Sequence, residues 1–407
     1  MKKIVQAWTG ISLVQRIVAG LVIGALLGMF VPSEGGIAIL GDVFVGALKA
    51  IAPLLVFFLV ISSLCYAGKS HGGVIRTVII MYMFSTFLAA IVAVTASSVF
   101  PVTLTLVDAA TDMAAPQGVA EVLRTLLMNV VTNPVQSLVS ANYIGILVWA
   151  VLIGIALRKA SDTTKQSLND ISAALSKTVT WIIQCAPFGI MGLVYNTVSV
   201  NGLSTFTEYG KLLAVLLGSM LFIYFVTNPI LVFWCIRKNP YPLIFKCLKK
   251  SAITAFFTRS SAANIPINME ACAEMGLDKD TYSVTIPLGA TINMDGAAIT
   301  ITVMTLAAAH TLGIAVDIPS AIILSILATL SACGASGVAG GSLLLIPMAC
   351  SLFGISNDIA MQIVGVGFII GVIQDSVETA LNSSSDLLLS ASAEFRQWRL
   401  EGKEILF

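Results

Sequence analysis

The sequence predicts an all-α polytopic membrane protein, and its composition and its recurring apolar runs are the two observations that predict it. The chain has 407 residues, of which 57% are hydrophobic and only 11% are charged, whereas soluble domains average about 25% charged residues. Apolar runs that approach the ~20 residues needed to cross a bilayer as a helix recur along the first half. The net charge of +1 at pH 7 argues against a nucleic-acid partner.

Six spans account for the first half of the chain. Gly20, Gly24 and Gly28 in the first span recur every four residues, a pattern that indicates close packing of one helix against another. The interrupted stretch VTNPVQSLVSAN at 131–142 obscures the boundaries of the fourth span. The apolar runs with their flanks place the spans at about 12–33, 40–66, 77–101, 127–158, 174–199 and 208–236.

Lysine and arginine are concentrated in alternate connections between the spans. Positively charged connections stay on the cytoplasmic side of a membrane. Both termini are therefore expected in the cytoplasm, with the chain in the inner (plasma) membrane of a bacterium, and no cleaved signal peptide is expected. The connections that are almost free of positive charge are 31–42, 101–118, 199–211 and 310–320.

The second half of the chain follows another pattern. A segment at about 243–275 has two short apolar arms around the polar centre Arg259–Ser261. Neither arm is long enough to cross a bilayer alone, which predicts a re-entrant helical hairpin. The next apolar segment, at about 279–309, is interrupted in its middle by Asn293–Gly296.

The same pattern occurs a second time, starting from the opposite side of the membrane. A hairpin at about 318–353, with a centre rich in glycine, serine and alanine, precedes a segment at 358–393 that is interrupted by the polar stretch 374–386. The first hairpin follows a cytoplasmic connection and the second a periplasmic one, so the copies form inverted repeats. Interrupted segments at matching places of such repeats indicate a transporter's binding site, because unpaired backbone inside a membrane is tolerated only where it lines a cavity or binds something.

Four polar residues of the last segment fall on one helix face. Asp375, Thr379, Asn382 and Asp386 are spaced by 4, 3 and 4 residues. At about 100° per residue they lie within ~60° of one another along ~16 Å of helix, so the stripe is long enough to bind more than one species. A helix contact held together by hydrogen bonds is the alternative interpretation.

Two carboxylates in these segments lie close to an amide: Asp295 near Asn293, and Asp386 near Asn382. A carboxylate inside the hydrocarbon costs roughly 2.5 kcal/mol or more, which points to a function. A carboxylate and an amide oxygen, together with carbonyls at helix ends, are suitable ligands for a dehydrated monovalent cation such as sodium. The third span adds three oxygen-bearing residues on one face: Tyr82, Ser85 and Thr86.

These segments contain motifs that together resemble a known family. The motifs are TRSSAANIP at the first hairpin tip, NMDG in the seventh span, GASGVAGGS at the second tip and D-x-x-x-T-x-x-N-x-x-x-D in the eighth span. Over its whole length the chain resembles the glutamate-transporter-type family of dicarboxylate and amino acid:cation symporters. The resemblance implies eight transmembrane helices plus two re-entrant hairpins, a homotrimer, and an elevator-type motion of the second half against a scaffold.

The resemblance also implies a division into domains. Residues 1–236 are expected to form mainly the scaffold and the trimer contacts, with the third span (about 77–101) and the sixth (about 208–236) moving with the transport domain. Residues 396–407 are the expected cytoplasmic tail. The expected transport core at 237–395 comprises hairpin 1 at about 243–275, span 7 at about 279–309, hairpin 2 at about 318–353 and span 8 at about 358–393.

Substrate-binding roles follow from the same resemblance. Asp375 resembles the carboxylate that receives the substrate ammonium, and Asn382, with the backbone at Ser261, resembles the group that binds the α-carboxylate. Arg259 is expected to pair with Asp375 or Glu378 when the site is empty. The implied substrate-binding residues are Ser260, Ser261, Val338, Gly340, Asp375, Glu378, Thr379 and Asn382.

The resemblance implies two or three coupled sodium ions, and no organic cofactor is expected. The third site is the one with the least trace in the sequence, because its ligands are backbone carbonyls. The implied ligands are, for one ion, the carbonyl of Gly289 with Asn293, Asn382 and Asp386; for another, Tyr82, Ser85, Thr86, Asn293 and Asp295; and for a third, carbonyls near Thr291, Ala332, Cys333 and Ala335.

Two departures from the family pattern concern the cargo. Members that take acidic substrates have an arginine where this chain has Glu378, and a hydroxyl residue where it has Ala297. A carboxylate at 378 would repel a substrate's side-chain carboxylate by about 4 kcal/mol at 4 Å and an effective dielectric of 20, whereas it can accept a hydrogen bond from a hydroxyl. The chain therefore looks most like the bacterial serine/threonine:sodium symporters. Alanine, asparagine, or an acidic substrate with protonated Glu378 are the alternative cargoes.

An enzyme and a channel are the remaining alternatives. Ser336 and Ser342 lie among glycines, superficially like a hydrolase nucleophile, but the two histidines, His71 and His310, fall at predicted segment ends. No base partner for either serine is evident, so an intramembrane hydrolase is not expected. A channel or a purely structural subunit would show no ion-coupled uptake.

Overall fold

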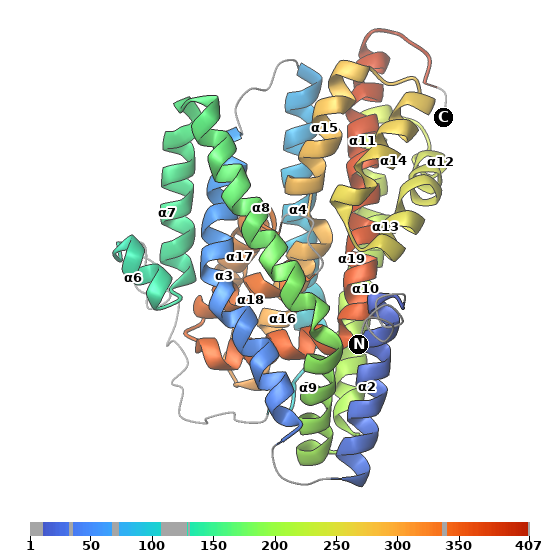
Figure 1. Cartoon of the computed structure of the whole chain (residues 1–407). Coiled ribbons are helices and arrows are strands. Elements are labelled where there is room, and N and C mark those ends of the chain that lie inside the picture. The colour runs from blue at the N-terminus through green and yellow to red at the C-terminus, as the bar shows by residue number, and fades with distance from the viewer. Residues whose placement is uncertain are drawn as a thin grey trace.

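Helices make up every regular element of the described chain. In this computed structural model the described residues are 11–31, 36–66, 73–106, 128, 131–335 and 340–405, and all regular elements in them are helical (Figure 1). Among these residues, six helices are long and apolar enough to cross a membrane, or seven if one bent pair counts as a span. The prediction of an all-α polytopic membrane protein is confirmed.

The first half contains helices close to most of the predicted spans. The first, second, third and sixth predicted spans agree with the observed helices to within a few residues at each end. The helices are α2 (Leu13–Phe30), α3 (Ala38–Tyr66), α4 (Gly73–Val99), α6 (Pro134–Val139), α7 (Tyr143–Ala156), α8 (Asp162–Gln184), α9 (Ala186–Asn201), α10 (Thr205–Phe222) and α11 (Asn228–Ile236), with a 3-10 turn at Leu157–Lys159 and a π-helical turn at Ile223–Thr227.

The fourth predicted span, 127–158, is not one helix in its described part. The short α6 and the longer α7 are separated around Ala141, whose φ is +51°. The side chain of Asn133 accepts hydrogen bonds from backbone N–H groups at the start of α6, and Asn142 does so for α7. The polar residues of this interrupted stretch therefore serve as helix caps. Residues 127, 129 and 130 lie outside the described part.

The fifth predicted span, 174–199, begins too late and omits a bend. The structure has α8 starting at Asp162 and α9 continuing from Ala186, with an angle of 55° between them. Pro187 lies in the first turn of α9, where its missing N–H is tolerated. The early part of α8 is polar, so a search for apolar runs does not detect it.

The second half contains both predicted hairpins. Hairpin 1 turns at Arg259, the first arm of hairpin 2 ends at Ala332 and its second begins at Ser342, and span 7 is broken at Asn293 and Met294. The elements are α12 (Tyr241–Cys247), a π-helical turn (Leu248–Ala252), α13 (Ile253–Thr258), α14 (Ser261–Glu274), α15 (Lys279–Ile292), α16 (Asp295–Thr311), α17 (Ile318–Ala332), a 3-10 turn (Ser342–Leu345), α18 (Ile346–Ser351) and α19 (Asn357–Leu400).

Helix α19 corrects the prediction of a broken last span. It is continuous from Asn357 to Leu400, so the stretch 374–386 does not interrupt it and the expected tail at 396–407 begins as helix. Hydroxyls in the polar stretch donate to carbonyls one turn back: Ser376 to Val372 at 2.9 Å and Thr379 to Asp375 at 2.8 Å. Polar side chains satisfied in this way do not need to break a helix.

The glycines of α2 pack against α9, as their spacing predicts. A Cβ at Gly28 would lie 2.9 Å from the Tyr195 carbonyl oxygen. Gly20 and Gly24 approach the backbone of Pro187 and Met191 even more closely. Because both series advance by four residues, the two helices stay in contact over two turns.

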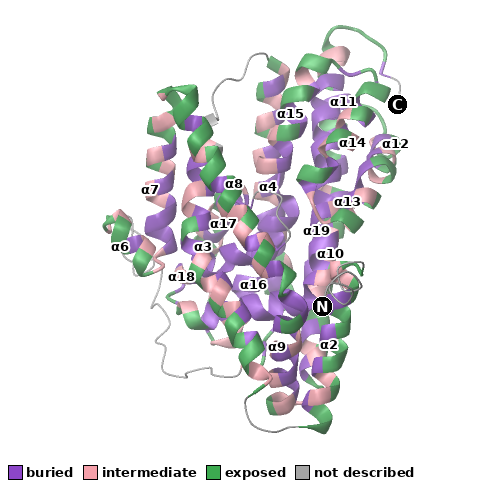
Figure 2. Ribbon diagram, viewed as in Figure 1, coloured by how far each residue is buried: buried purple, intermediate pink, exposed green. Residues whose placement is uncertain are grey.

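Burial divides the helices into two groups (Figure 2). Every residue of α16 from Asp295 to Ala309 is buried, and α19 is buried along most of its length. Helix α2 instead exposes apolar side chains such as Val18, Val22 and Leu26, which is the pattern of a lipid-facing surface. Figure 1 shows α6 and α7 on one side of the molecule and α12 to α14 on the other, beside α19.

Candidate functional site

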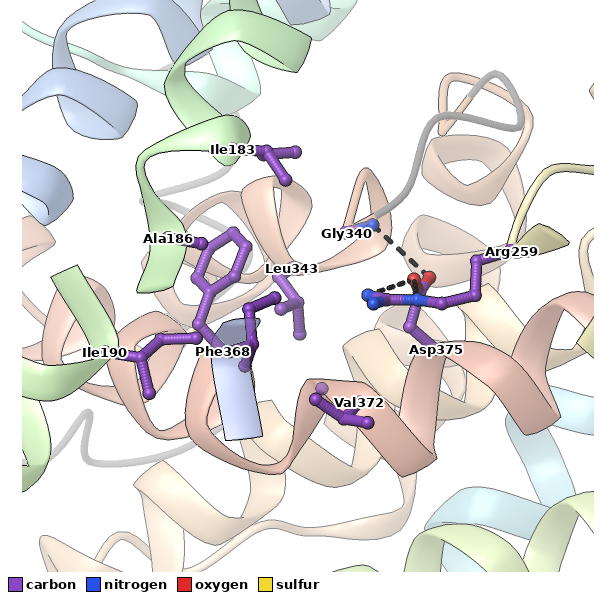
Figure 3. Close-up of a pocket in the computed structure, with 11 residues that line it drawn as sticks. Ile183, Ala186, Ile190, Arg259, Gly340, Leu343, Phe368, Val372 and Asp375 are labelled. Atoms are coloured by element: carbon purple, nitrogen blue, oxygen red, sulfur yellow. Dashed lines mark hydrogen bonds and ion pairs between the residues drawn. The ribbon is translucent and has the colours of Figure 1, made fainter. Parts of the chain in front are cut away.

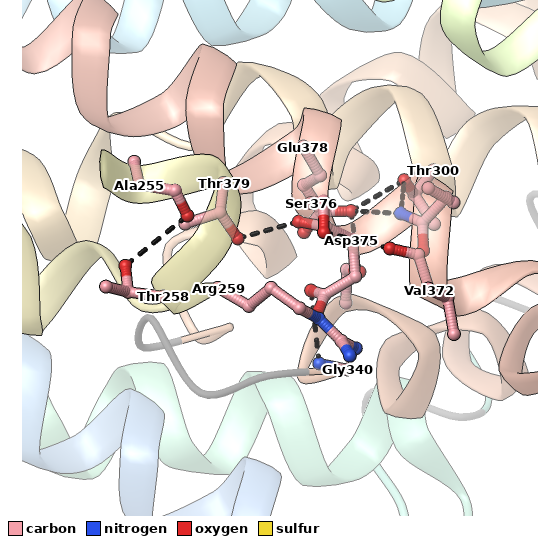
Figure 4. Close-up of polar contacts among 12 residues, drawn as sticks. Ala255, Thr258, Arg259, Thr300, Gly340, Val372, Asp375, Ser376, Glu378 and Thr379 are labelled. Atoms are coloured by element: carbon pink, nitrogen blue, oxygen red, sulfur yellow. Dashed lines mark hydrogen bonds and ion pairs between the residues drawn. The ribbon is translucent and has the colours of Figure 1, made fainter. Parts of the chain in front are cut away.

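The tip of hairpin 1 is built around Arg259. Helix α13 ends at Thr258, Arg259 adopts the left-handed conformation with φ of +52°, and the Ser260 side chain caps α14 by accepting the Ala263 N–H at 3.2 Å. A positive φ at a non-glycine residue costs about 1–2 kcal/mol. This conformation directs the guanidinium toward α19, where Nε and Nη2 each lie 2.6 Å from Oδ2 of Asp375 (Figure 4).

Asp375 contacts the tips of both hairpins. Its Oδ2 pairs with Arg259 of hairpin 1, and its Oδ1 accepts the backbone N–H of Gly340 in hairpin 2 at 3.3 Å. Gly340 has a φ of +72°, a conformation that glycine adopts without strain. The Arg259 and Asp375 side chains are only 12% and 5% exposed, so this is a buried ion pair. Val338, predicted in the same tip, lies outside the described residues.

A cavity borders this ion pair (Figure 3). Its polar groups are Arg259, Asp375 and the backbone of Gly340, and the rest of its lining is apolar. The accessible space is about that of one water molecule, so the cavity marks where the charged groups meet and does not hold an amino acid in this conformation. The apolar lining comes from α2, from α8 and α9, from hairpin 2 and from the early part of α19: Ile17, Ile183, Ala186, Ile190, Leu343, Phe368 and Val372.

The polar stripe of α19 contacts different elements along its length. The Thr379 hydroxyl stays on its own helix, and the Asn382 side-chain oxygen accepts the Gly296 N–H at the start of α16 at 2.7 Å. Ser261, at the start of α14, is buried. Asp375, Thr379, Asn382 and Asp386 therefore share one face of α19, as their spacing predicts, but their side chains contact different groups.

Asp386 and Asn293 form the best-defined carboxylate–amide pair. Nδ2 of Asn293 donates to Oδ1 of Asp386 at 2.8 Å, and both residues are fully buried. Oδ1 of Asn293 and Oδ2 of Asp386 have no hydrogen-bond partner among the described residues. A Cβ at Gly289 would lie 2.8 Å from Oδ1 of Asp386. Two unpartnered buried oxygens next to a glycine that leaves room are suitable for a bound cation.

Asp295 is surrounded by hydroxyls of α4. Its Oδ2 accepts the Ser85 hydroxyl at 2.8 Å and its Oδ1 the Thr86 hydroxyl at 3.2 Å, and its side chain is fully buried. The Tyr82 hydroxyl instead donates to the carbonyl of Asp386 at 2.9 Å. Three of the predicted residues are thus brought together, while the Tyr82 hydroxyl contacts the backbone beside the Asp386 pair.

The third predicted ion site lies where α17 ends beside the break of span 7. The Thr291 hydroxyl donates to the Leu288 carbonyl at 2.8 Å. The Cys333 thiol lies 3.7 Å from the carbonyl of Ile292, and the Ala332 carbonyl accepts the Ala335 N–H at 2.9 Å. The two segments are adjacent, and the Ala332 carbonyl already takes part in a turn.

Glu378 is held by three donors whose contact with it was not predicted from the sequence. Its Oε2 accepts Thr300 of α16 at 2.7 Å, Ser342 of hairpin 2 at 2.9 Å and Gln374 of its own helix at 2.5 Å (Figure 4). Gln374 was detectable, because residues four apart on a helix are neighbours. Thr300 and Ser342 come from distant segments and have no local signal.

The described chain is a helical membrane protein in which two hairpin tips meet at a buried ion pair beside further buried carboxylates, and this arrangement defines a membrane carrier. The model of the sodium:dicarboxylate symporter family matches residues 13–394. The chain belongs to this family, which confirms the resemblance that its motifs indicated. It is accordingly a transporter and not an enzyme.

Curated relatives match the chain along nearly all of its length. The serine/threonine transporter SstT of Streptococcus thermophilus is 57% identical over 400 residues, which is 98% of this chain and 100% of the relative. Its counterpart in Bifidobacterium adolescentis is 55% identical over 406 residues, or 100% of this chain and 94% of the relative. A third, from Streptococcus agalactiae, is 57% identical over 395 residues, or 97% and 98% of the two chains.

Proposed function

We propose that this protein is a sodium-coupled symporter that imports serine and threonine by alternating access. The observation that supports this most directly is the full-length similarity to proteins named serine/threonine transporters. The family description, sodium:dicarboxylate symporter, adds sodium as the coupling ion. The alternatives of alanine, asparagine or acidic cargo predict different competition in the same assay.

In this proposal the substrate binds between the two hairpin tips. Asp375 binds the ammonium group of the substrate after Arg259 has moved away from Asp375. Ser260 and Ser261 present the N-terminus of α14, where free backbone N–H groups favour an anion, to the α-carboxylate together with Asn382. Hairpin 2, through Val338 and Gly340, closes over the ligand, and Glu378 and Thr379 lie beside its side chain.

Sodium ions bind at two buried carboxylates in the proposal. Asp386 with Asn293, Asn382 and the Gly289 carbonyl holds one ion, and Asp295 with Ser85, Thr86 and Tyr82 holds another. A third ion at the carbonyls of 291 and 332–335 would bring the number to three. Each of the first two sites has a single carboxylate, which balances the charge of one monovalent cation. The unpartnered oxygens beside Asp386 support this assignment.

Glu378 excludes acidic cargo in the proposal. It is buried and its Oε2 accepts three hydrogen bonds, which favours a carboxylate that stays in place as an acceptor. A substrate carboxylate near it would meet repulsion of about 4 kcal/mol at 4 Å. A substrate hydroxyl would instead find an acceptor. This explains how a member of a family described by dicarboxylates would take serine and threonine.

The proposed transport mechanism is an elevator motion within a homotrimer of eight-span subunits with inverted repeats and cytoplasmic termini. The buried α16 and α19 and the two hairpins form the moving core, and α2, α3 and α9 belong to the scaffold. The cavity lies between α8–α9 and the hairpin tips, which is the boundary across which such a core would slide.

Uptake by proteoliposomes tests the proposed function. Purified full-length protein should accumulate labelled serine when sodium is higher outside, and excess serine or threonine should inhibit this uptake more strongly than alanine, asparagine or aspartate. Uptake that a proton gradient drives equally well without sodium would overturn the coupling. Strong inhibition by aspartate with none by serine would overturn the substrate.

A further inference from the structure

An unexplained buried amide lies beside Asp295. Asn228 is fully buried in the predominantly apolar α10–α11 segment. Its Oδ1 lies 3.2 Å from the Ser85 hydroxyl, and its Nδ2 has no hydrogen-bond partner among the described residues. An unsatisfied buried polar group of this kind is rare in native proteins and calls for an explanation.

The backbone before Asn228 is shaped to present this side chain. The π-helical turn Ile223–Thr227 directly precedes it, and the Asn228 N–H donates to the carbonyl of Ile223, five residues back. A π turn adds one residue to a helical turn and so changes the direction of the side chains that follow, and such turns are frequent at functional sites. In this chain the result is that Asn228 of α11 meets Ser85 of α4.

The hydrogen bonds around Ser85 leave the amide oxygen of Asn228 available. A serine hydroxyl has one proton, and Ser85 lies 2.8 Å from the carboxylate of Asp295 but 3.2 Å from Asn228. The shorter, charge-assisted bond to Asp295 takes the proton. Oδ1 of Asn228 is therefore a neutral oxygen whose lone pairs are free to accept another partner. It lies close to the Ser85 hydroxyl, which contacts the Asp295 carboxylate.

We propose that Asn228 is a further member of the Asp295 cation site, where it supplies a neutral amide oxygen. This inference rests on the proposed sodium coupling through Asp295. It adds a ligand from α11 to the groups that α4 and α16 provide. The site keeps a single negative charge, which suits a monovalent ion, while the additional oxygen replaces part of the ion's hydration shell.

Sodium binding to purified full-length protein tests the inference. The measurement is the sodium concentration that gives half of the maximal thermal stabilisation, which does not depend on transport. Asn228→Leu should raise this concentration about tenfold, which corresponds to ~1.4 kcal/mol. Ser219→Ala is the matched control, because Ser219 is buried in the same span and its hydroxyl donates to the Val215 carbonyl one turn back. A wild-type sodium response in Asn228→Leu would overturn the inference.

Two further variants separate this inference from the function on which it rests. If Asp295→Asn raises the half-maximal sodium concentration while Asn228→Leu keeps the wild-type value, the inference fails and the sodium site stands. If Asp295→Asn also responds as the wild type does, both fail. Should Asn228→Leu not fold, the nearly isosteric Asn228→Asp places a second carboxylate at the site. Calcium should then compete with sodium, and unchanged cation selectivity would overturn the inference.

Discussion

The guanidinium of Arg259 lies 2.6 Å from the carboxylate of Asp375, so a cation of the protein itself occupies the place proposed for the substrate ammonium. The two charges come from hairpin 1 and α19, and the backbone of Gly340 in hairpin 2 adds a third contact. Binding of an amino acid must therefore exchange one cation for another at Asp375. This exchange links ligand binding to the position of the hairpin 1 tip.

Asp375→Asn is expected to abolish amino-acid binding and to leave the protein folded. A neutral amide cannot replace a buried carboxylate as the partner of an ammonium, and loss of such a pair costs about 3–5 kcal/mol, more than 100-fold in affinity. Calorimetric titration with serine in saturating sodium measures the effect, with size-exclusion chromatography as the check on folding. Wild-type affinity in the variant would exclude the role of Asp375.

Arg259→Ala is expected to destabilise the substrate-free protein and to enlarge the stabilisation that serine provides. Without the guanidinium, Asp375 is an uncompensated buried charge until the substrate ammonium restores the pair. Thermal unfolding with and without serine, in sodium, measures both effects. Arg259→Lys keeps the charge and is the control. If serine stabilised Arg259→Ala no more than the wild type, the two cations would not compete.

Much of the fold could be predicted because membrane helices leave long uniform runs. The hairpin tip at Arg259 and the break at Asn293 were detectable because polar residues there interrupt apolar segments. The start of α8 and the continuity of α19 were not detectable. Both helices contain polar residues that form local hydrogen bonds or lie at the surface. A rule based on apolar length treats all such residues as interruptions.

The part of the candidate site that lies on α19 was predictable from the sequence, whereas the contacts between different helices were not. That Asp375 and Asp386 lie on one helix face follows from helical spacing alone. The three donors to Glu378 belong to α16, hairpin 2 and α19, and nothing local in the sequence relates Thr300 to Ser342. Asn228 was not predicted, because only the structure shows that its side chain contacts Ser85 of α4.

Asp386→Asn is expected to weaken sodium binding at least about tenfold and substrate binding with it. The variant removes the charge that balances the ion, and the coupling between two ligands is reciprocal. The half-maximal sodium concentration for serine binding is the measurement. Glu394→Gln, a buried acid on the same helix that bonds to the Asp278 N–H, is the matched control. Unchanged sodium dependence in Asp386→Asn would remove Asp386 from the site.

A covalent link between α3 and the start of α19 is expected to block transport without blocking binding. Lys49 and Asp358 form an ion pair across the proposed boundary between scaffold and core, and both side chains are accessible. Lys49→Cys with Asp358→Cys, joined by a short bis-maleimide in a Cys185→Ser background, would fix the two units together. Cys185 is the free cysteine that is exposed. Full uptake after complete cross-linking would contradict a sliding core.

The groups around Glu378 determine which substitution can test whether this residue selects the substrate. A carboxylate uses Thr300, Ser342 and Gln374 as donors, but hydroxyls also accept hydrogen bonds. The Gln374 amide oxygen is buried without a partner, so the amide can turn and present it. The pocket can therefore satisfy an arginine. Space is limited, because a Cβ at Gly296 would already lie 2.9 Å from Cγ of Glu378, and a stability loss of about 1–3 kcal/mol is expected.

Glu378→Arg, combined with Ala297→Thr, is expected to lower serine and threonine uptake and to admit aspartate. The substitution replaces a charge that repels a substrate carboxylate by about 4 kcal/mol at 4 Å with one that attracts it, so inhibition by aspartate should strengthen at least tenfold. Competition against labelled serine at neutral pH measures the change in both variants and the wild type. Ala297→Thr alone is the control, since it alters the neighbouring residue without the charge. If aspartate inhibited the double variant no better than the wild type, Glu378 would not be the residue that excludes acidic cargo.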